Sequence, residues 1–194
     1  DIVDILVRNS RLPTSAFGDL NGQLAALDLG VRRLTELLDE YGADTVSEAL
    51  TALSDRAEAL MRAEVAALPD GTFEATDYLD NDGIVDEPIP IEVAITIAAD
   101  RLTLDFTGTS AQVAGPVNIA EPTAVACCYV AMKHLFPDLP ANAGVMRPVD
   151  VVPPPNSLLS AHFPAPTCAY TETILRMIDV MLSAFAKAAP QNAV

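Results

Sequence analysis

Three clusters of polar side chains could do chemistry in this chain, because they combine residue types that bind anions and amides. The clusters are Arg8, Asn9, Arg11, Asp19 and Gln23; Asp105, Thr109, Gln112 and Asn118; and Glu172 with Arg176. Guanidinium groups form charge-assisted pairs with carboxylates and phosphates, so Arg8, Arg11 and Arg176 are candidate anion contacts. Asp105, Gln112 and Asn118 could order their loop or hydrogen-bond an amide. All of these residues are candidate contacts for a substrate or for another subunit.

Each cluster also has a purely structural interpretation. Glycines near the clusters can supply turns. Thr171 or Thr173 can cap the last helix, and Glu172 suits its first turn. Arg176 and Asp179 have the i, i+3 spacing of a helical ion pair. Structural and functional roles therefore both remain open at this level.

Metal-binding motifs give no site within the chain. The stretch Asp80-Asn81-Asp82-Gly83 is similar to a calcium loop, but Tyr78 and Ile89 occupy positions where the template needs oxygen ligands. We therefore interpret it as an acidic turn between strands. His134 and His162 are far apart in sequence, and neither has an obvious ligand neighbour. No residue is assigned to a metal.

Nucleophile and nucleotide motifs are also missing. Adjacent Cys127 and Cys128 lie in an apolar run, which favours small buried side chains over a nucleophile. Together with Cys168 they give no spaced disulfide framework, which is typical of a reducing compartment, and we expect the cytoplasm. The sequence has no glycine-rich phosphate loop and no Gly-x-Ser-x-Gly elbow. If ATP takes part, we expect its main site outside this chain.

The composition argues against two classes of partner. Among 194 residues, 27 are acidic and 11 are Lys or Arg, which gives a formal net charge of −16. A field of this sign repels nucleic acids and anionic membrane surfaces. No apolar run reaches the roughly 18 residues that a membrane span needs. We therefore expect neither a nucleic-acid nor a membrane partner, and a hydrophobic content of 51% indicates a folded core.

Helical periodicity dominates the first part of the chain. Apolar residues recur at spacings of three and four over 19–41, which predicts a helix that stops at Gly42. A second such series predicts a helix from about Asp44 to Leu68, ended by Pro69-Asp70-Gly71. Two long helices joined by so few residues indicate an antiparallel helical hairpin. Residues 2–7 are either a strand or a helix end.

The rest of the chain combines strands with two further helices. Alternation of apolar residues predicts an antiparallel meander of strands at 73–79, 89–97 and 102–106, and 158–163 is a further candidate. Helices are expected at 123–136, buried on most sides, and at 171–189. The fold class is α+β, an antiparallel β-meander packed with a long helical hairpin and two further helices. We expect domains at 1–71 and 72–194, or one continuous domain of a larger subunit.

Short motifs follow one another along nearly the whole chain. They are Arg8-Asn9-Ser10-Arg11-x-Pro13, Gly18-Asp19-Leu20-x-x-Gln23, Gly30-x-Arg32-Arg33-Leu34-x-Glu36-Leu37, Tyr41-Gly42, Leu68-Pro69-Asp70-Gly71, Asp80-x-Asp82-Gly83, Asp105-Phe106-x-Gly108-Thr109-Ser110-x-Gln112-x-x-Gly115-Pro116-x-Asn118, Pro137-Asp138-x-Pro140-x-Asn142-x-Gly144, Arg147-Pro148, Glu172-Thr173 and Arg176. In this order the motifs resemble the hydantoinase B/oxoprolinase family. Each motif alone is weak, but the ordered series is specific.

The resemblance implies an ATP-dependent enzyme that hydrolyses the C–N bond of a cyclic amide such as 5-oxoproline or a hydantoin. It also implies a hydantoinase A-type partner subunit, with ATP and a divalent metal in the intact complex. Chains of the hydantoinase B type are longer, so we expect a piece of such a chain that binds none of these cofactors alone, with metal ligands before Asp1. A related ATP-dependent ketone carboxylase and a noncatalytic assembly module remain as alternatives.

Overall fold

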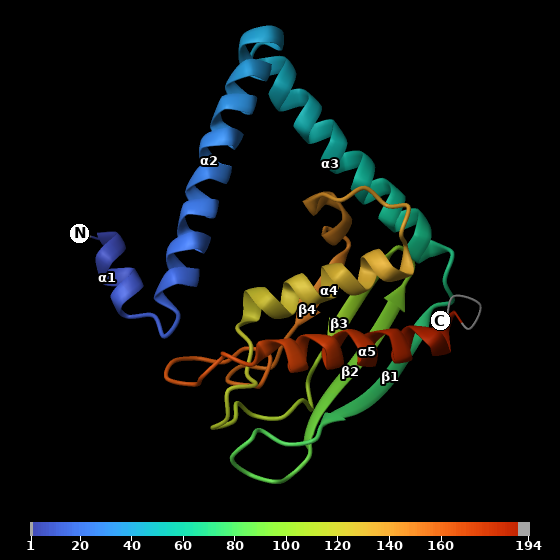
Figure 1. The fold of residues 1–194 in the computed structure, drawn as a ribbon. Coiled ribbons are helices and arrows are strands. Elements are labelled where there is room, and N and C mark those ends of the chain that lie inside the picture. The colour runs from blue at the N-terminus through green and yellow to red at the C-terminus, as the bar shows by residue number, and fades with distance from the viewer. Residues whose placement is uncertain (1, 190–194) are drawn as a thin grey trace. The chain divides into compact units, whose positions relative to one another are not determined.

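The computed structural model describes residues 2–189 and divides the chain into two compact units, Asp1–Ala52 and Leu53–Val194. The elements in chain order are α1 (Ile2–Arg8), α2 (Pro13–Tyr41), α3 (Ala43–Ala66), β1 (Gly71–Leu79), β2 (Ile89–Ala98), β3 (Arg101–Asp105), α4 (Glu121–Leu135), the 3-10 helix η1 (Ala143–Met146), β4 (Val149–Val152) and α5 (Tyr170–Ala188) (Figure 1). The boundary between the units falls inside α3. None of the helices in the described residues has both the length and the hydropathy of a membrane crossing.

The first unit contains α1 and α2, with α1 packed beside α2. Residues 2–7 are therefore helical, the second of the two alternatives. Helix α2 begins at Pro13, earlier than the predicted Asp19, because the fixed φ of proline suits the first turn of a helix. It ends at Gly42, which has a φ of 81° and donates its N–H to the Leu38 carbonyl at 2.9 Å. Tyr41-Gly42 thus terminates the helix as predicted.

Helices α2 and α3 follow one another across Gly42, at the positions predicted for the helical hairpin. No residue of α2 is buried. In α3 the buried residues are Ala57, Met61 and Val65, all in the half that belongs to the second unit. These side chains join the core of that unit. Helical periodicity located both helices.

The C-terminal half of α3 is fixed to η1 by close approach and by ion pairs. A Cβ atom on Gly144 would lie 2.0 Å from the Ser54 carbonyl oxygen, so only glycine allows this contact. Arg147 pairs with Asp55 at 2.6 Å and with Glu58 at 3.2 Å. Half-exposed ion pairs each contribute little to the free energy of unfolding. The close contact at Gly144 and the buried apolar residues therefore account for most of the attachment of this half of α3 to the second unit.

The sheet of the second unit has the order β1-β2-β3-β4. Strands β1, β2 and β3 pair in antiparallel fashion, with Phe73 opposite Ile95 and Ile97 opposite Leu102. Alternate residues of β2, from Ile89 to Ile97, are buried, as the period of two predicts for a sheet with one covered face. The α+β class and the three-stranded meander are confirmed.

The fourth strand corrects the sequence prediction in the proline-rich segment. β4 pairs parallel to β3, with Leu102 opposite Val149, so the sheet is mixed. The candidate strand at 158–163 does not form, and this region makes only an isolated bridge between Ala111 and Ser157. The backbone hydrogen bonds of this region go to two different segments. The Leu158 N–H donates to the Ser110 carbonyl, and the Ala161 N–H donates to the Ile119 carbonyl.

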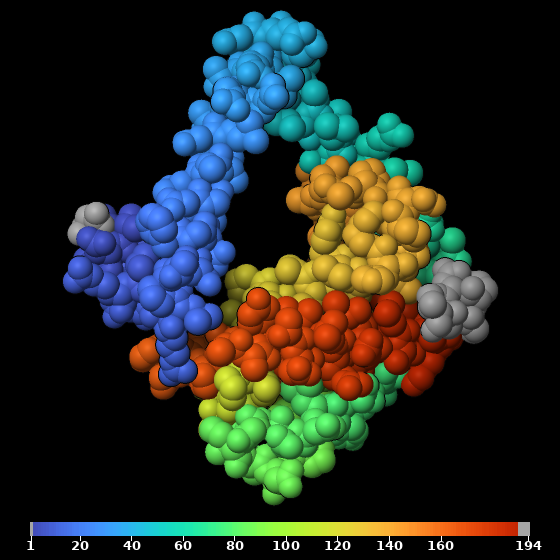
Figure 2. All heavy atoms as spheres, viewed as in Figure 1, coloured from blue at the N-terminus to red at the C-terminus, as the bar shows by residue number. Residues whose placement is uncertain are grey.

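Helices α4 and α5 lie side by side over the sheet (Figures 1 and 2). α5 contacts β1 and β2 and buries Met177, Val180 and Phe185 among other residues. α4 buries a narrower face, while Val125 and Val130 remain exposed, which corrects the prediction of a helix buried on most sides. These helices and the sheet position the second and third polar clusters.

Candidate functional site

The main polar site of the second unit is a junction of two loops with the start of α5, which we call the loop junction and define by Asp82, Gly115, Asn118 and Thr173. All four are buried. The segment before β2 contributes Asp82, the segment after β3 contributes Gly115 and Asn118, and α5 contributes Thr173. Of the predicted site residues, the junction contains Asn118, and it connects the loop of the second cluster to the helix that carries Glu172 and Arg176.

Asp82 holds its own turn and the neighbouring loop with one carboxylate. Its Oδ1 accepts hydrogen bonds from the N–H groups of Ile84 at 2.9 Å and Val85 at 2.7 Å. Its Oδ2 accepts from the Gly115 N–H at 2.8 Å. The N–H groups of Val85, Ile84 and Gly115 hold the pKa of this carboxyl below its usual value, because they stabilise the charged form. The predicted acidic turn is thus a hydrogen-bonded anchor.

Asn118 is fully buried and bonds only to backbone groups. Its Oδ1 accepts from the Val113 N–H at 2.8 Å. Its Nδ2 donates to the carbonyls of Val113 at 2.9 Å, Gly115 at 2.9 Å and Pro166 at 3.0 Å. These hydrogen bonds use both the oxygen and the nitrogen of the side-chain amide. The Asn118 side chain therefore fixes the shape of the loop after β3 and holds that loop against the segment before α5.

The start of α5 is attached to the same loop. Thr173 donates its hydroxyl to the Val117 carbonyl, and the Ala169 N–H donates to Pro116 at 2.9 Å. Neither Thr171 nor Thr173 caps α5, whose N-cap residue is Ala169 without a side-chain bond. Thr173 instead serves the buried contact between helix and loop.

Arg176 pairs with a residue that the sequence analysis did not select. Its guanidinium donates to the Asp77 carboxylate of β1 at 2.6 Å, whereas within the described residues the predicted partner Asp179 makes no ion pair with it. The Arg176 guanidinium holds the pKa of Asp77 below its usual value. Both side chains are little more than one-third exposed, and Glu172 is exposed on the same helix. The pair ties α5 to the edge strand.

The other residues of the second cluster each fix one part of the loop. Asp105 accepts from the Thr107 N–H at 2.8 Å, which closes a turn after β3. Thr109 is buried and exchanges hydrogen bonds with the backbone N–H and carbonyl of Glu92 on β2. Gln112 accepts from the His162 N–H at 2.9 Å. The cluster therefore orders its loop, one of the two roles expected for it.

The first cluster lies in the first unit. Arg8, Asn9, Arg11, Asp19 and Gln23 are all exposed there. Asn9 donates to the Ile5 carbonyl at 2.7 Å and so closes the end of α1. The two arginines lie at the α1–α2 connection, where their guanidinium groups are accessible to an anion.

Two pockets of the second unit bear on binding. A pocket of about 280 Å³ beside the loop junction is lined by Asp82, Val85, Glu87, Pro88, Ile89, Ser110, Val113 and Ala114. Its lining mixes apolar side chains with the carboxylates of Asp82 and Glu87 and the Ser110 hydroxyl, and the Asp82 carboxylate already accepts from three N–H groups. The two carboxylates disfavour an anionic ligand in this pocket.

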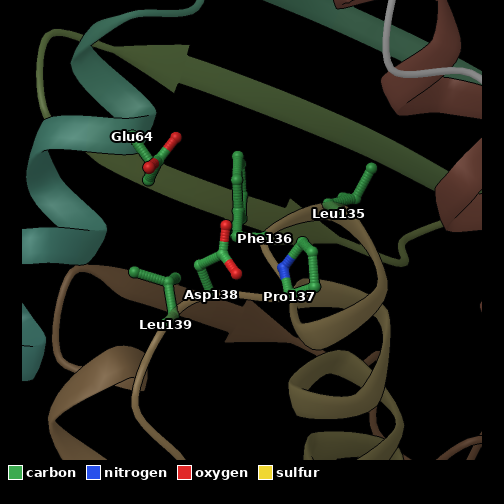
Figure 3. A pocket seen from close by; sticks show the side chains of 6 residues that line it. All are labelled: Glu64, Leu135, Phe136, Pro137, Asp138 and Leu139. Carbon is green, nitrogen blue, oxygen red and sulfur yellow. The ribbon is translucent and has the colours of Figure 1, made fainter.

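A smaller pocket of about 160 Å³ lies between α3 and the turn after α4 (Figure 3). Glu64 and Asp138 line it, and Figure 3 shows both side chains next to the Phe136 ring. Lys133 directs its ammonium group to the carbonyls of Pro137 and Leu139, which closes the turn. Two carboxylates make the lining negative, which disfavours a phosphate or carboxylate ligand.

The adjacent cysteines are buried side chains of α4, as predicted. Burial raises the pKa of Cys127 to about 11 and raises that of Cys128 further. Both thiols are therefore protonated near neutral pH, and a protonated thiol is a poor nucleophile.

Acid should loosen the loop junction and the Asp77–Arg176 pair. The folded-state pKa values of Asp77 and Asp82 lie below the unfolded value of about 4, so their ionised forms stabilise the fold above that pH. That stabilisation is lost as the pH falls through the folded-state values. We expect Asp82→Asn to be less stable at pH 7 and to lose less further stability on acidification below pH 4. Urea midpoints followed by tyrosine fluorescence measure this, and an unchanged acid slope would contradict it; Asp80→Asn is the exposed control.

Comparison with known proteins gives the family. The hydantoinase B/oxoprolinase family model matches residues 1–194. The B subunit of a putative D-/L-hydantoinase from Pseudomonas sp. (strain NS671) is 34% identical over 201 residues, which cover 97% of this chain and 34% of that protein. The caprolactamase beta subunit of Pseudomonas jessenii is 31% identical over 99% of this chain and 33% of that protein. The chain thus spans about a third of the length of these relatives.

Solved structures agree with this assignment. The crystal structure of the ATP-dependent caprolactamase from Pseudomonas jessenii matches 99% of this chain and 34% of that chain, with a TM-score of 0.87 and 30% identity. A nucleotide-free acetone carboxylase matches 82% of this chain and 23% of that chain, with a TM-score of 0.72 and 15% identity, and is similar in fold. The family model and the ordered motifs agree over the whole chain, and the chain belongs to the hydantoinase B/oxoprolinase family.

Proposed function

We propose that the protein carrying this chain opens a cyclic amide by ATP-dependent hydrolysis of its C–N bond. The observation that supports this most strongly is the match of nearly the entire chain to an ATP-dependent caprolactamase. A caprolactam and a hydantoin are both cyclic amides, so the names of the relatives share one bond type. 5-Oxoproline, a hydantoin and a lactam are the substrate candidates.

Ring opening of an unactivated amide explains the need for ATP. Phosphoryl transfer to the amide oxygen makes the carbonyl carbon electrophilic, and water then adds to it while the ring nitrogen leaves with a proton. When the ring nitrogen leaves, the carbon is left as an acyl phosphate, and a second water hydrolyses this to the carboxylate and phosphate. The balance is one cyclic amide, two waters and one ATP converted to the ring-opened acid, ADP and phosphate. In this scheme the loop junction positions a loop, while the accessible guanidinium groups of Arg8 and Arg11 contact an anionic group of the substrate or of the other subunit.

The cofactors belong to the intact complex in this proposal. Within the described residues, no group of three or more His, Cys, Asp or Glu side chains could hold a metal ion. The donor set of residues 2–189 therefore does not fit the divalent metal that the family resemblance implies, and we derive no step through a metal held here. We place the metal and the main nucleotide site elsewhere in the complex.

The partner in this proposal is a hydantoinase A-type subunit. Two relatives carry names of single subunits, the B subunit of a hydantoinase and the beta subunit of a caprolactamase. We expect the pair, and not the 194-residue chain alone, to be active.

The test is turnover by the full-length gene product co-expressed with its A-type subunit. Release of the ring-opened acid with stoichiometric ADP would support the proposal: an amino acid from 5-oxoproline or caprolactam, or an N-carbamoyl acid from N-methylhydantoin. Inactivity on all three amides, with bicarbonate-dependent ATP use on a ketone, would instead assign a carboxylase, which the fold match to acetone carboxylase makes the second candidate. The 194-residue chain is the control for background hydrolysis.

A further inference from the structure

Strand β1 forms an open edge of the sheet in the second unit. The order β1-β2-β3-β4 gives β1 one neighbour, and no strand of residues 2–189 pairs with its outer side (Figure 1). β1 has nine residues, whereas β4, at the other edge of the sheet, has four. A long open edge presents unpaired backbone groups to which a strand of another molecule can add. The groups that occupy this edge therefore bear on self-association of the chain.

The register shows which backbone groups of β1 point outward. Strands β2 and β3 are joined by the two-residue turn Ala99-Asp100, which is flanked by the pair Ala98 and Arg101. Even-numbered residues of β2 therefore hydrogen-bond to β3, and odd-numbered residues hydrogen-bond to β1. Odd-numbered residues of β2 lie opposite odd-numbered residues of β1, as Ile95 lies opposite Phe73. The N–H and carbonyl groups that face outward are consequently those of Thr72, Glu74, Thr76 and Tyr78.

Side chains already occupy two of these outward groups. Lys187, in the last turn of α5, donates its ammonium group to the Glu74 carbonyl at 2.5 Å. The Tyr78 N–H donates to Oδ1 of Asp77 at 2.8 Å. Oδ2 of Asp77 accepts from Arg176, also on α5, at 2.6 Å. Helix α5 therefore holds both positions, one through Lys187 itself and one through the Arg176–Asp77 pair.

These contacts obstruct the addition of a strand in two ways. An incoming strand would have to donate to the Glu74 carbonyl and accept from the Tyr78 N–H, and both groups already have partners. The Lys187 ammonium group also places a charge where the next strand would lie. Glu74 is near the middle of β1, so a strand that pairs with the whole edge must displace Lys187.

We propose that Lys187, together with Asp77, closes the edge of β1 to the β1 strand of a second copy of this chain. The same edge on two molecules is self-complementary, because antiparallel strands can pair about a twofold axis. Thr72, Phe73 and Thr76 are residue types that favour strands, so the edge would pair readily if it were open. Loss of the closing contacts would join two sheets into one continuous sheet. This inference does not depend on the proposed function.

Self-association of the 194-residue chain tests the proposal. Lys187→Met removes the ammonium group but keeps an unbranched side chain at an exposed position. The substitution also makes the net charge of −16 one unit more negative, so charge alone would weaken association. We expect dimers in sedimentation velocity, with a dissociation constant at least about tenfold below that of the unsubstituted chain. Hydrogen exchange of residues 71–79 should slow as the protein concentration rises.

Two further variants separate edge closure from charge. Arg56→Met makes the same charge change at an exposed position of α3, outside the sheet. Lys187→Arg keeps a charged donor at the edge and should behave like the unsubstituted chain. Equal self-association of Lys187→Met and Arg56→Met would overturn the proposal, as would dimers in which residues 71–79 exchange as fast as in the monomer. Dimers of the unsubstituted chain with protected residues 71–79 would also overturn it, because the edge would then be open.

Discussion

Replacing Gly115 by alanine is expected to destabilise the second unit by about 3 kcal/mol, because the loop junction has no space for a side chain there. The added Cβ would lie 1.8 Å from the Asp82 carbonyl oxygen and 2.6 Å from its Cβ. These atoms belong to backbone or to a side chain that is itself held by three N–H groups. The two loops must therefore move apart, which also lengthens the Gly115–Asp82 hydrogen bond.

Tyrosine fluorescence during urea unfolding is the appropriate measurement, since three of the four tyrosines, Tyr78, Tyr129 and Tyr170, lie in the second unit. Gly18→Ala is the matched control, because a Cβ at that position meets no atom within 4 Å. We expect it to leave the transition of the second unit unchanged and to favour the helix. A midpoint for Gly115→Ala equal to that of the unsubstituted chain would show that the two loops separate at little cost.

The elements that could be located from the sequence each keep a regular apolar repeat over many residues. Five or more apolar residues at helical spacing defined α2, and strict alternation defined β2. β4 has only four residues inside a proline-rich segment, so alternation had too few positions in which to appear. Its pairing with β3 is also parallel and distant in sequence, and local turn signals do not indicate such a pairing.

The partners of the candidate site residues were harder to predict than the residues themselves. Asp77 and Arg176 are 99 positions apart, and Asp82 and Gly115 are 33 apart. Composition identified Asp82 as part of an acidic turn, but its buried position depends on where two loops meet. The Arg176–Asp179 spacing was a local signal that tertiary structure overrode, because α5 lies beside β1 and offers Arg176 a closer carboxylate.

Replacing Asn118 by alanine should have an effect of similar or larger size. The buried amide serves four backbone groups, the N–H and carbonyl of Val113 and the carbonyls of Gly115 and Pro166. Each buried group left without a partner costs roughly 1–3 kcal/mol, and we expect a total loss of about 4 kcal/mol. The same urea assay measures it, with exposed Asn21→Ala as the control. A loss below about 1 kcal/mol would mean that water replaces the amide without difficulty.

Asn118→Asp separates the hydrogen-bonding role of this residue from its size. Aspartate has almost the same shape and can still accept from the Val113 N–H, but its charged form presents an oxygen to three carbonyl oxygens that Nδ2 now serves. Burial and these carbonyls should raise the pKa of the new carboxyl in the folded state. Its protonated form is then favoured by folding, so the variant should gain stability relative to the unsubstituted chain as the pH falls from 7 toward 5. If the difference between the two proteins stayed constant over this range, the donor role of Asn118 would be minor and its contribution would come from packing.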